Sequence, residues 1–430
     1  MSGLCWCVML VAAASAAAAA AAAAVSDSSV AMKTVWLAGR NVEVTAEPPQ
    51  WDENGYMMAF GCMGRFGNQF DYLLGTMEVA EKSGRTLIIA PWVDYNARAT
   101  TGQYPWFPWF KEYFRMDTMA DFNGGKVIDA ADFIYHFRGK WKAATAKEGD
   151  GYVGFCSYVK PDAAPGDQEC MTFSAPKGPF WENLNITFDK IFGPIGKKTP
   201  ELIRTFEHPV LAMDCSPGKY PAPITLDPLS RYLKWSDIVL EPAISFIKDN
   251  LERPFVAMHF RHAFAKASCG FSAQSQCGHF AGPDDPLGDE VCVPSIDDME
   301  EHLSAVMHAI GAKSIFIASD KPISQEMAAM FRKYAPFAAL PTGQNENNGH
   351  IVPGRAGSPQ HDLAILTLAD HAILHCPSSF SNIAKRLRMY PHAYPMKQGD
   401  DPAPYISTSY WGIPKSIPQV RGSHAEYDEL

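Results

Sequence analysis

The apolar residues of the chain fall into short runs and helical spacings that alternate along its length. The first clear case is an apolar run at 56–60, which predicts a strand, followed by a glycine loop at 64–69. The positions after the loop have the spacing of one helix face: Phe70, Leu73, Leu74 and Met77. A strand, a glycine loop and a helix in this order direct free backbone N–H groups toward an anion. Arg65 adds a planar fork of donors at the same place. The alternative is a tight turn that only holds a strand against a helix.

The same alternation predicts the other elements of the first half. Strands are expected at 86–90 and 208–213, with a loop-rich segment at 139–200 between them and a helical crossover at 229–248. Aromatic residues are dense between 95 and 114. We interpret them as core filling rather than as a sugar-binding platform, because large aromatic side chains dominate protein cores.

The second half has the clearest pattern in the chain. A buried strand at 255–260 ends at Arg261, and a helix follows a cysteine-bearing insertion. Ser295 and Asp298 form a capping-box pattern at the start of that helix, and Gly311 ends it. Further strands are predicted at 314–318, 337–340 and 372–376, and further helices at 324–334, 360–370 and 378–388. This alternation predicts a parallel, doubly wound sheet, on which ligands bind at the carboxyl ends of the strands.

Length and charge narrow the class of protein. A chain of 430 residues, 47% of them hydrophobic, can fill two α/β cores. Its formal net charge of −10 argues against a general nucleic-acid surface, so we expect no nucleic-acid partner. Any anionic ligand must therefore be bound by a local pocket.

Both ends of the chain carry patterns typical of targeting signals. Residues 1–25 contain no charge, and they are apolar from Val8 to Val25 except for Ser15, which predicts a signal peptide. An uncleaved anchor is the alternative, because the usual basic residues are missing; we expect no stable membrane span after cleavage. The chain ends in Asp-Glu-Leu at 428–430, similar to the KDEL class of retrieval signals. Together the two ends predict the lumen of the endoplasmic reticulum.

The cysteines agree with that compartment. Ten are present, and two of them, Cys5 and Cys7, lie in the predicted signal peptide. The others are candidates for disulfides, because their number is even and the lumen is oxidising. They are Cys62, Cys156, Cys170, Cys215, Cys269, Cys277, Cys292 and Cys376. A single N-glycosylation sequon, at Asn185, supports the same compartment.

The candidate functional residues of the second half lie near the ends of its predicted strands. His259 and Arg261 end the first strand, Asp362 lies on the helix before the last strand, and residues 378–380 follow it. Two serine hydroxyls at a helix N-terminus suit a pyrophosphate. We predict a functional role for Arg261, with an interdomain salt bridge as the alternative.

Two other kinds of chemistry have little support in the sequence. Asp-x-Asp, the usual metal-binding pattern of sugar-nucleotide enzymes, is absent, and strand alternation directs His259 and His262 to opposite faces. We therefore expect no metal. No Gly-x-Ser-x-Gly pattern supports a serine hydrolase.

At this point the residues resemble a known family. Residues 62–69, Cys-Met-Gly-Arg-Phe-Gly-Asn-Gln, are similar to the N-terminal signature of the GDP-fucose protein O-fucosyltransferases, and most similar to the type that modifies EGF-like repeats. Matching pieces continue in the same order to about 390: Arg85-Thr86-Leu87 with Pro91-Trp92, Gly178-Pro179-Phe180-Trp181, Trp235-Ser236-Asp237, His259-Phe260-Arg261, Ala369-Asp370-His371 and Ser378-Ser379-Phe380. The resemblance implies an α/β fold of GT-B glycosyltransferase architecture, with two Rossmann-like domains facing a central cleft.

The resemblance also implies an activity. The enzyme would be a peptide-O-fucosyltransferase that moves fucose from GDP-fucose to a Ser or Thr hydroxyl, inverts the sugar's configuration and requires no cofactor or metal. Its acceptors would be folded EGF-like repeats of secreted or cell-surface proteins, such as Notch-type receptors. One alternative is the related transferase for thrombospondin type 1 repeats. Another is a lectin or chaperone of the endoplasmic reticulum that kept the fold and lost catalysis.

Site residues follow from the matched motifs. The first loop, with Arg65, Phe66, Gly67 and Asn68, would line the donor and acceptor site. His259, Phe260 and Arg261 would lie at the diphosphate, and Asp362, Ser379 and Phe380 would bind the rest of GDP. Arg261 and Asn68 are the catalytic candidates. Arg261 would bind the charge that grows on the leaving β-phosphate, and Asn68 would orient the acceptor hydroxyl.

The family pattern also implies disulfides, and the chain departs from it in two places. The implied pairs are Cys156–Cys170, Cys269–Cys292 and Cys277–Cys376, and we hypothesise that Cys62 pairs with Cys215. The family's Asp-Trp pair after the second-loop arginine is missing from 261–269. This absence is the feature that supports the non-catalytic alternative. Gly61-Cys62 also stands where the family has Cys-x-Cys.

Pattern and resemblance together divide the chain into five segments. They are a signal peptide at 1–25, a linker at 26–50, an N-terminal Rossmann-like, acceptor-side domain at 51–235, a C-terminal Rossmann-like, GDP-fucose-binding domain at 236–415, and a tail with the retrieval signal at 416–430.

Overall fold

The computed structural model describes most of the chain between residues 31 and 416. The described residues are 31–59, 64–93, 107–144, 152–155, 184, 186, 188–192, 200–213, 216–217, 221–262, 269, 272–273, 276–277, 287–321, 323–334, 338–339, 358–390, 407–413 and 416. The predicted signal peptide, the Asp-Glu-Leu terminus and the sequon residue Asn185 lie outside these ranges.

The first half of the chain forms a parallel sheet of six strands in the order β5-β4-β3-β8-β6-β7. Its strands are β3 (Tyr56–Ala59), β4 (Thr86–Ile89), β5 (Val127–Asp129), β6 (Tyr152–Phe155), β7 (Phe188–Phe192) and β8 (Val210–Met213). All residues of β4 and β8 are buried, as expected for a parallel sheet covered on both faces. The strands predicted at 56–60, 86–90 and 208–213 are thereby confirmed. The segment at 139–200, predicted to be rich in loops, contributes the two strands β6 and β7 to the same sheet, which the sequence did not predict.

Helices and short helical turns cover this sheet. They are α2 (Phe66–Ser83), α4 (Phe110–Tyr113), α5 (Ala130–Ala144) and α7 (Pro200–Arg204), with 3-10 turns at Asp117–Met119, Phe122–Gly125 and Ile224–Tyr232. Helix α2 ends at Gly84, whose φ of 71° is the left-handed conformation that terminates many helices. The aromatic residues Trp109, Phe110 and Phe114 are at most 2% exposed, so the described part of the aromatic stretch fills the core as predicted.

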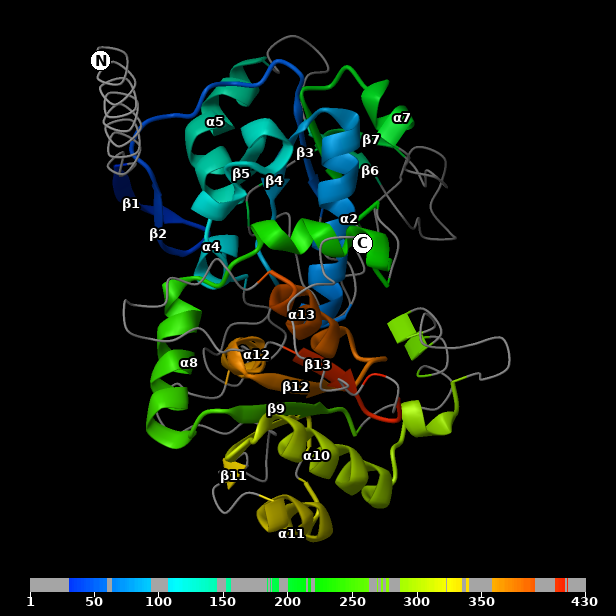
Figure 1. Cartoon of the computed structure of the whole chain (residues 1–430). Coiled ribbons are helices and arrows are strands. Elements are labelled where there is room, and N and C mark those ends of the chain that lie inside the picture. Colours follow the sequence, from blue (N-terminus) through cyan, green and yellow to red (C-terminus); the bar gives the residue numbers. More distant parts are fainter. Residues whose placement is uncertain are drawn as a thin grey trace, which may run out of the picture.

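The second half forms a parallel sheet of five strands in the order β11-β10-β9-β12-β13. Its strands are β9 (Phe255–Phe260), β10 (Ser314–Ser319), β11 (Ala338–Ala339), β12 (His371–Leu374) and β13 (Ser407–Tyr410). The helices are α8 (Asp237–Asn250), α10 (Ile296–Ile310), α11 (Gln325–Tyr334), α12 (Pro359–Leu368) and α13 (Ser379–Arg388), with a 3-10 turn at Asp289–Val291. Figure 1 shows this sheet below the first one, with α13 between the two.

Local signals placed several of these elements correctly. The Ser295 hydroxyl accepts the backbone N–H of Asp298 at 3.1 Å, the Asp298 side chain reaches back to Ser295, and Gly311 ends α10 with a φ of 62°. The crossover predicted as one helix at 229–248 is instead a 3-10 turn at Ile224–Tyr232 followed by α8. Leu233 and Ser236 have extended backbone, and Trp235 between them forms an isolated β-bridge with Phe114, so no helix continues from one element into the other.

The prediction of a linker at 26–50 is wrong over its described part. Strands β1 (Met32–Leu37) and β2 (Arg40–Thr45) form an antiparallel hairpin. Val42 and Val44 are at most 4% exposed and pack with residues of the first half, because alternate side chains of β2 face the protein. The Thr45 N–H also donates to Asp132 Oδ1 at 2.6 Å, which ties the hairpin to α5. The other segment boundaries stay predictions.

Among the described residues, one hydrophobic cluster extends across both halves, and each half also has a cluster of its own. The shared cluster combines α2 residues such as Phe70 with α12 residues such as Leu363. Trp235, at the junction, stacks on Phe114 with 4.8 Å between ring centroids and donates its indole N–H to Thr367 Oγ1 at 3.4 Å. A shared core of this kind holds the two sheets in one relative orientation.

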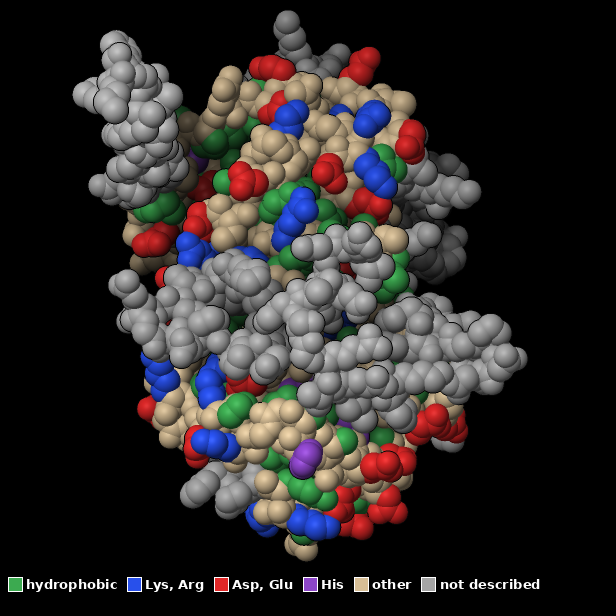
Figure 2. Space-filling model, in the orientation of Figure 1, with side chains coloured by type: hydrophobic (Ala, Val, Ile, Leu, Met, Phe, Trp, Pro, Cys, Tyr) green, Lys and Arg blue, Asp and Glu red, His purple; other side chains and the backbone are tan. Residues whose placement is uncertain are grey.

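The described surface carries both acidic and basic side chains. Figure 2 shows acidic and basic side chains interspersed over both halves of one face. Among the described residues, no helix has the length and apolar character needed to cross a membrane.

Candidate functional site

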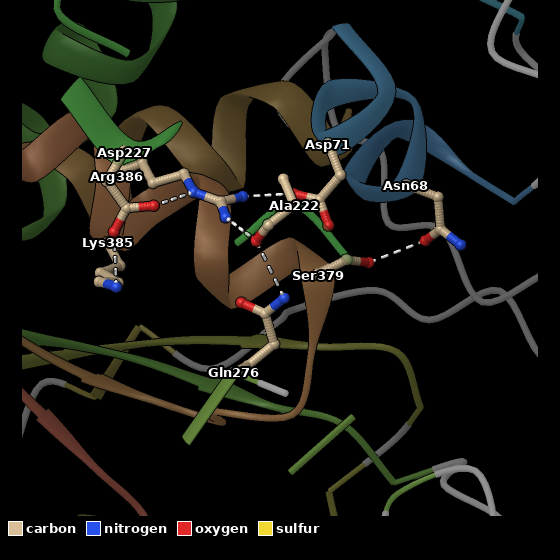
Figure 3. Close-up of polar contacts among 8 residues, drawn as sticks. All are labelled: Asn68, Asp71, Ala222, Asp227, Gln276, Ser379, Lys385 and Arg386. Carbon is tan, nitrogen blue, oxygen red and sulfur yellow. Dashed lines mark hydrogen bonds and ion pairs between the residues drawn. The ribbon is translucent and has the colours of Figure 1, made fainter. Parts of the chain in front are cut away.

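The loops that follow β3 and β12 meet at the junction of the two halves. Asn68 lies in the first turn of α2, and Ser379 is the first residue of α13. The Ser379 hydroxyl donates to Asn68 Oδ1 at 2.8 Å (Figure 3). Carboxyl ends of parallel strands are where α/β sheets bind ligands, so this contact joins the two candidate ligand-binding edges.

Two glycines allow the first loop to take this shape. Gly64 has a φ of +73°, and a Cβ there would lie 2.2 Å from Asn68 Nδ2. A Cβ on Gly67 would lie 2.6 Å from Ser379 Oγ and 2.9 Å from the backbone N of Phe380. The first glycine therefore permits the turn, and the second permits the approach of α2 to α13.

The remaining loop residues divide between core and surface. Phe66 is 8% exposed and packs against Trp92 and Tyr113, with ring centroids 4.6 and 5.4 Å away. Gln69 binds the backbone of Val93 twice, through its Nε2 to the carbonyl at 2.9 Å and through its Oε1 to the N–H at 2.8 Å. Arg65 is exposed. The core contacts fix the loop and leave the Arg65 side chain at the surface.

Arg261 follows β9 and forms an ion pair within its own half. Its Nε lies 3.3 Å from Asp320 Oδ2, and Asp320 follows the neighbouring strand β10. The Asp320 Oδ1 accepts the backbone N–H of His262 at 2.7 Å. Asp320 thus holds both the guanidinium and the backbone beside it. The salt bridge of Arg261 therefore lies within the second half and is not the interdomain salt bridge considered as its alternative role.

His259 is buried beside α13. Its Nδ1 lies 2.7 Å from the Ser381 hydroxyl, and its ring centroid lies 4.7 Å from that of Phe380. The Ser381 oxygen accepts the N–H of His375 at 2.9 Å, so its own proton is directed to His259 Nδ1. Burial holds the pKa of His259 well below its ordinary value, so the ring is neutral and its proton is on Nε2.

His375 supports the end of β9. It donates from Nε2 to the Val291 carbonyl at 3.0 Å and accepts the Arg261 N–H at Nδ1, 3.1 Å away. Its ring stacks on Phe260 with 5.6 Å between centroids. Burial lowers the pKa of His375 to about 4, which matches a neutral ring with one donor and one acceptor. The candidates His259, Phe260 and Arg261 are therefore held by one network.

Asp362 lies apart from this network, in the first turn of α12. Burial raises the pKa of its carboxyl to about 7, although the residue keeps partial solvent exposure. Within the described ranges, no contact joins its side chain to the other candidate residues. A carboxylate of this kind suits a ligand that brings its own N–H donors.

The sequence did not indicate one buried group at the junction. Arg386 is 1% exposed and donates to three acceptors from the first half: Asp227 Oδ1 at 2.7 Å, the Ala222 carbonyl at 2.9 Å, and Asp71 (Figure 3). Burial opposes its charge, but the carboxylates of Asp71 and Asp227 hold the pKa of Arg386 above its ordinary value. Its helical spacing shows only that it faces inward, so no local signal could have named these partners.

Two of the implied disulfides are present, Cys269–Cys292 and Cys277–Cys376. The second connects the insertion to the residue two positions after β12. Cys62, Cys156, Cys170 and Cys215 lie outside the described residues, so their pairings stay predictions. No cluster of His, Cys, Asp and Glu suited to a metal occurs in the described part of the chain.

Two parallel α/β halves whose candidate ligand-binding edges meet at a shared junction have the architecture of GT-B glycosyltransferases, as predicted. The model of the GDP-fucose protein O-fucosyltransferase family matches residues 56–391. The chain belongs to this family.

Individual relatives agree with that assignment. The chain is 29% identical over 400 residues to GDP-fucose protein O-fucosyltransferase 1 of Caenorhabditis elegans, which covers 86% of this chain and 92% of the relative. Crystal structures of POFUT1 in complex with GDP-fucose and in its apo form are each 26% identical, with a TM-score of 0.64. Each covers 85% of this chain and 100% of the POFUT1 chain.

Proposed function

We propose that the enzyme transfers fucose from GDP-fucose to a Ser or Thr hydroxyl of folded EGF-like repeats. It does so with inversion of the sugar's configuration, without a metal, and in the lumen of the endoplasmic reticulum. The similarity to the Caenorhabditis elegans enzyme, over nearly the whole of both chains, supports the type 1 assignment. The observation that carries the proposal is the hydrogen bond between Ser379 and Asn68, because it joins a nucleotide-side helix to an acceptor-side loop.

The donor diphosphate has a suitable place at the second half. The N-terminus of α13 offers free backbone N–H groups and the hydroxyl of Ser378. The Nε2–H of neutral His259 adds a donor beside Phe380. Arg261 adds a guanidinium whose Nε lies against Asp320, which leaves its Nη groups for phosphate oxygens.

The chemical step follows from that placement. The acceptor oxygen forms a bond to the anomeric carbon from the face opposite GDP, and the bond from that carbon to the β-phosphate oxygen breaks. The electron pair leaves with GDP, so negative charge grows on the β-phosphate, which would lie beside Arg261 and the α13 N-terminus. Interactions that strengthen as this charge grows lower the barrier. Backside attack inverts the configuration.

The acceptor side is supplied by the first loop. Because the Asn68 carbonyl oxygen accepts from Ser379, its amide N–H₂ is free to orient a hydroxyl or a sugar oxygen. Arg65 lies at the exposed edge of the same loop. The acceptor's proton must leave during the reaction, and we assign it to no side chain.

Asp362 suits the guanine base. An ionised carboxylate accepts two hydrogen bonds from adjacent N–H groups, and the Watson–Crick edge of guanine carries such a pair. Among the described residues, the Asp362 side chain contacts none of the other candidates, which fits a base held away from the reacting sugar.

A transfer assay tests this function. Purified enzyme is incubated with GDP-fucose and either a folded EGF-like repeat or a folded thrombospondin type 1 repeat, with and without EDTA. We expect fucose on the EGF-like repeat only, in the α configuration by NMR, at a rate that EDTA does not change. Transfer only to the thrombospondin repeat would identify the other enzyme type. GDP-fucose binding without transfer to either repeat would favour the lectin or chaperone alternative.

A further inference from the structure

Helices α2 and α13 contact each other at two separate points. At the first, the Ser379 hydroxyl donates to Asn68 Oδ1. At the second, Arg386 donates to Asp71. On α2, Asn68 and Asp71 are one turn apart, and on α13, Ser379 and Arg386 are two turns apart. Residues with these spacings share a helix face, so the two contacts belong to one interface (Figure 3).

The second contact is more deeply buried than the first and involves more partners. Arg386 and Asp71 are at most 1% exposed, and Asp227 adds a second carboxylate on the same guanidinium. Lys385 donates to the other oxygen of Asp227 at 2.8 Å. Both Arg386 and Asp71 are closed off from water, so a change in their geometry would leave a buried charge without its full set of hydrogen bonds.

A planar guanidinium with three fixed acceptors permits few relative orientations of the helices that it joins. Buried ion pairs often add little stability compared with apolar residues, and their established use is to specify one register. Arg386 lies at the far end of the helix that begins with Ser379. A register fixed at Arg386 therefore also fixes the position of Ser379 relative to α2.

We propose that Arg386 is a positioning residue for the transfer reaction. Through Asp71 it fixes α2 against α13, and thereby places Asn68 at the nucleotide-side residues of Ser379. The inference rests on the proposed function, because it takes the α13 N-terminus as the diphosphate site. Nucleotide binding then depends on the second half alone, whereas the reaction depends on the register of both halves.

The test compares Arg386→Lys with a matched control. Arg388 is also buried on α13, at 3% exposure, and its guanidinium donates only to the second half, including the carbonyls of Leu366 and Ala369. Arg388→Lys should lower the melting temperature and leave kcat unchanged. Arg386→Lys should lower kcat by about 10²-fold, the scale of an ångström-sized misplacement, while the Kd for GDP measured by calorimetry stays the same.

A second variant tests the route of the effect. If Arg386 acts through the contact between Asn68 and Ser379, Ser379→Ala and Arg386→Lys should be non-additive in kcat. Fully additive effects would overturn the proposal. So would an Arg386→Lys variant whose kcat is wild type, or one whose GDP affinity falls as steeply as kcat.

Hydrogen exchange provides a readout that does not need transfer. In Arg386→Lys, amide exchange should become faster in the first turns of α2 and stay unchanged in β9 and α10. Unchanged exchange in α2 would reject the register role. If the wild-type enzyme transfers fucose to no repeat, the proposed function fails, and the exchange measurement still decides whether Arg386 fixes α2.

Discussion

Gly67 lies against the backbone of Ser379, so that a Cβ on Gly67 would come within 2.8 Å of the Ser379 carbonyl carbon. No other residue type fits between α2 and α13 without moving one of them. At this point the two halves of the enzyme are too close for even one added methyl group. The missing side chain of Gly67 therefore sets the distance between the candidate ligand-binding edges.

Gly67→Ala should separate the two helices. We expect kcat to fall by about 10²-fold, because the added methyl group displaces Asn68 from Ser379. Steady-state kinetics with GDP-fucose and an EGF-like repeat would measure the change.

Gly84→Ala, at the other end of α2, is the matched control for that variant. A Cβ there meets nothing within 4 Å, but its φ of +71° strains an alanine. It should cost about 1 kcal/mol of stability and leave kcat as it is. Equal kinetics for the two variants would show that the contact of Gly67 with Ser379 does not matter for transfer.

Asp320→Asn should weaken transfer by releasing Arg261. The change removes the charge that lies 3.3 Å from the guanidinium, so Arg261 no longer has one favoured orientation. We expect kcat/KM for GDP-fucose to fall about 10-fold, compared with about 10² or more for Arg261→Ala, which removes the guanidinium itself. Glu252→Gln breaks an exposed ion pair with Lys313 before the neighbouring strands and should have no effect. A wild-type rate for Asp320→Asn would mean that Arg261 needs no partner.

GDP affinity should depend on pH through Asp362. The pKa of this carboxyl is raised to about 7 by burial, and only the ionised form accepts two N–H groups from guanine. Affinity should therefore be full above pH 7 and fall by about tenfold for each pH unit below it. Calorimetric titration with GDP between pH 5.5 and pH 8.5, a range of about three units around that pKa, would show the slope. Asp362→Asn should bind weakly at every pH, and an unaltered slope in that variant would assign the titration to another group.

His302 should make the fold sensitive to acid. Burial lowers its pKa to about 4, and its Nε2 lies 2.8 Å from Ser409 Oγ. Since the unfolded chain binds this proton near pH 6.5 and the folded protein binds it only near pH 4, stability falls as the pH drops between these values. At pH 5 the group should cost about 2 kcal/mol relative to neutral pH.

His302→Gln keeps a hydrogen-bonding side chain and removes that titration. In urea unfolding at pH 7 and pH 5, the variant should lose less stability on acidification than the wild type does, by about that amount. Parallel curves for the two proteins would exclude His302 as a source of the acid sensitivity.

Local sequence signals predicted the elements that they control directly. The strand at 255–260 was identified to the residue, and Ser295 and Gly311 placed both ends of α10, because capping depends on a few neighbouring side chains. The hairpin at Met32–Thr45 was missed because its alternation is short and its partners lie on α5. Strand β13 was missed for a similar reason, since it pairs with β12 after a long intervening segment.

The sequence by itself determined the family, many of the strands and helices along the chain, and the candidate residues that lie near the strand ends. Only the tertiary structure decided how those residues are held. Arg386 and Asp71 are 315 positions apart, and Asp320 is 58 positions from the residue after Arg261. Hydrophobic periodicity shows which face of an element is buried, but the partner of a buried charge depends on which distant element packs against that face. The loop at 64–69 could be recognised from its sequence, and its contact with Ser379 could be found only in the folded chain.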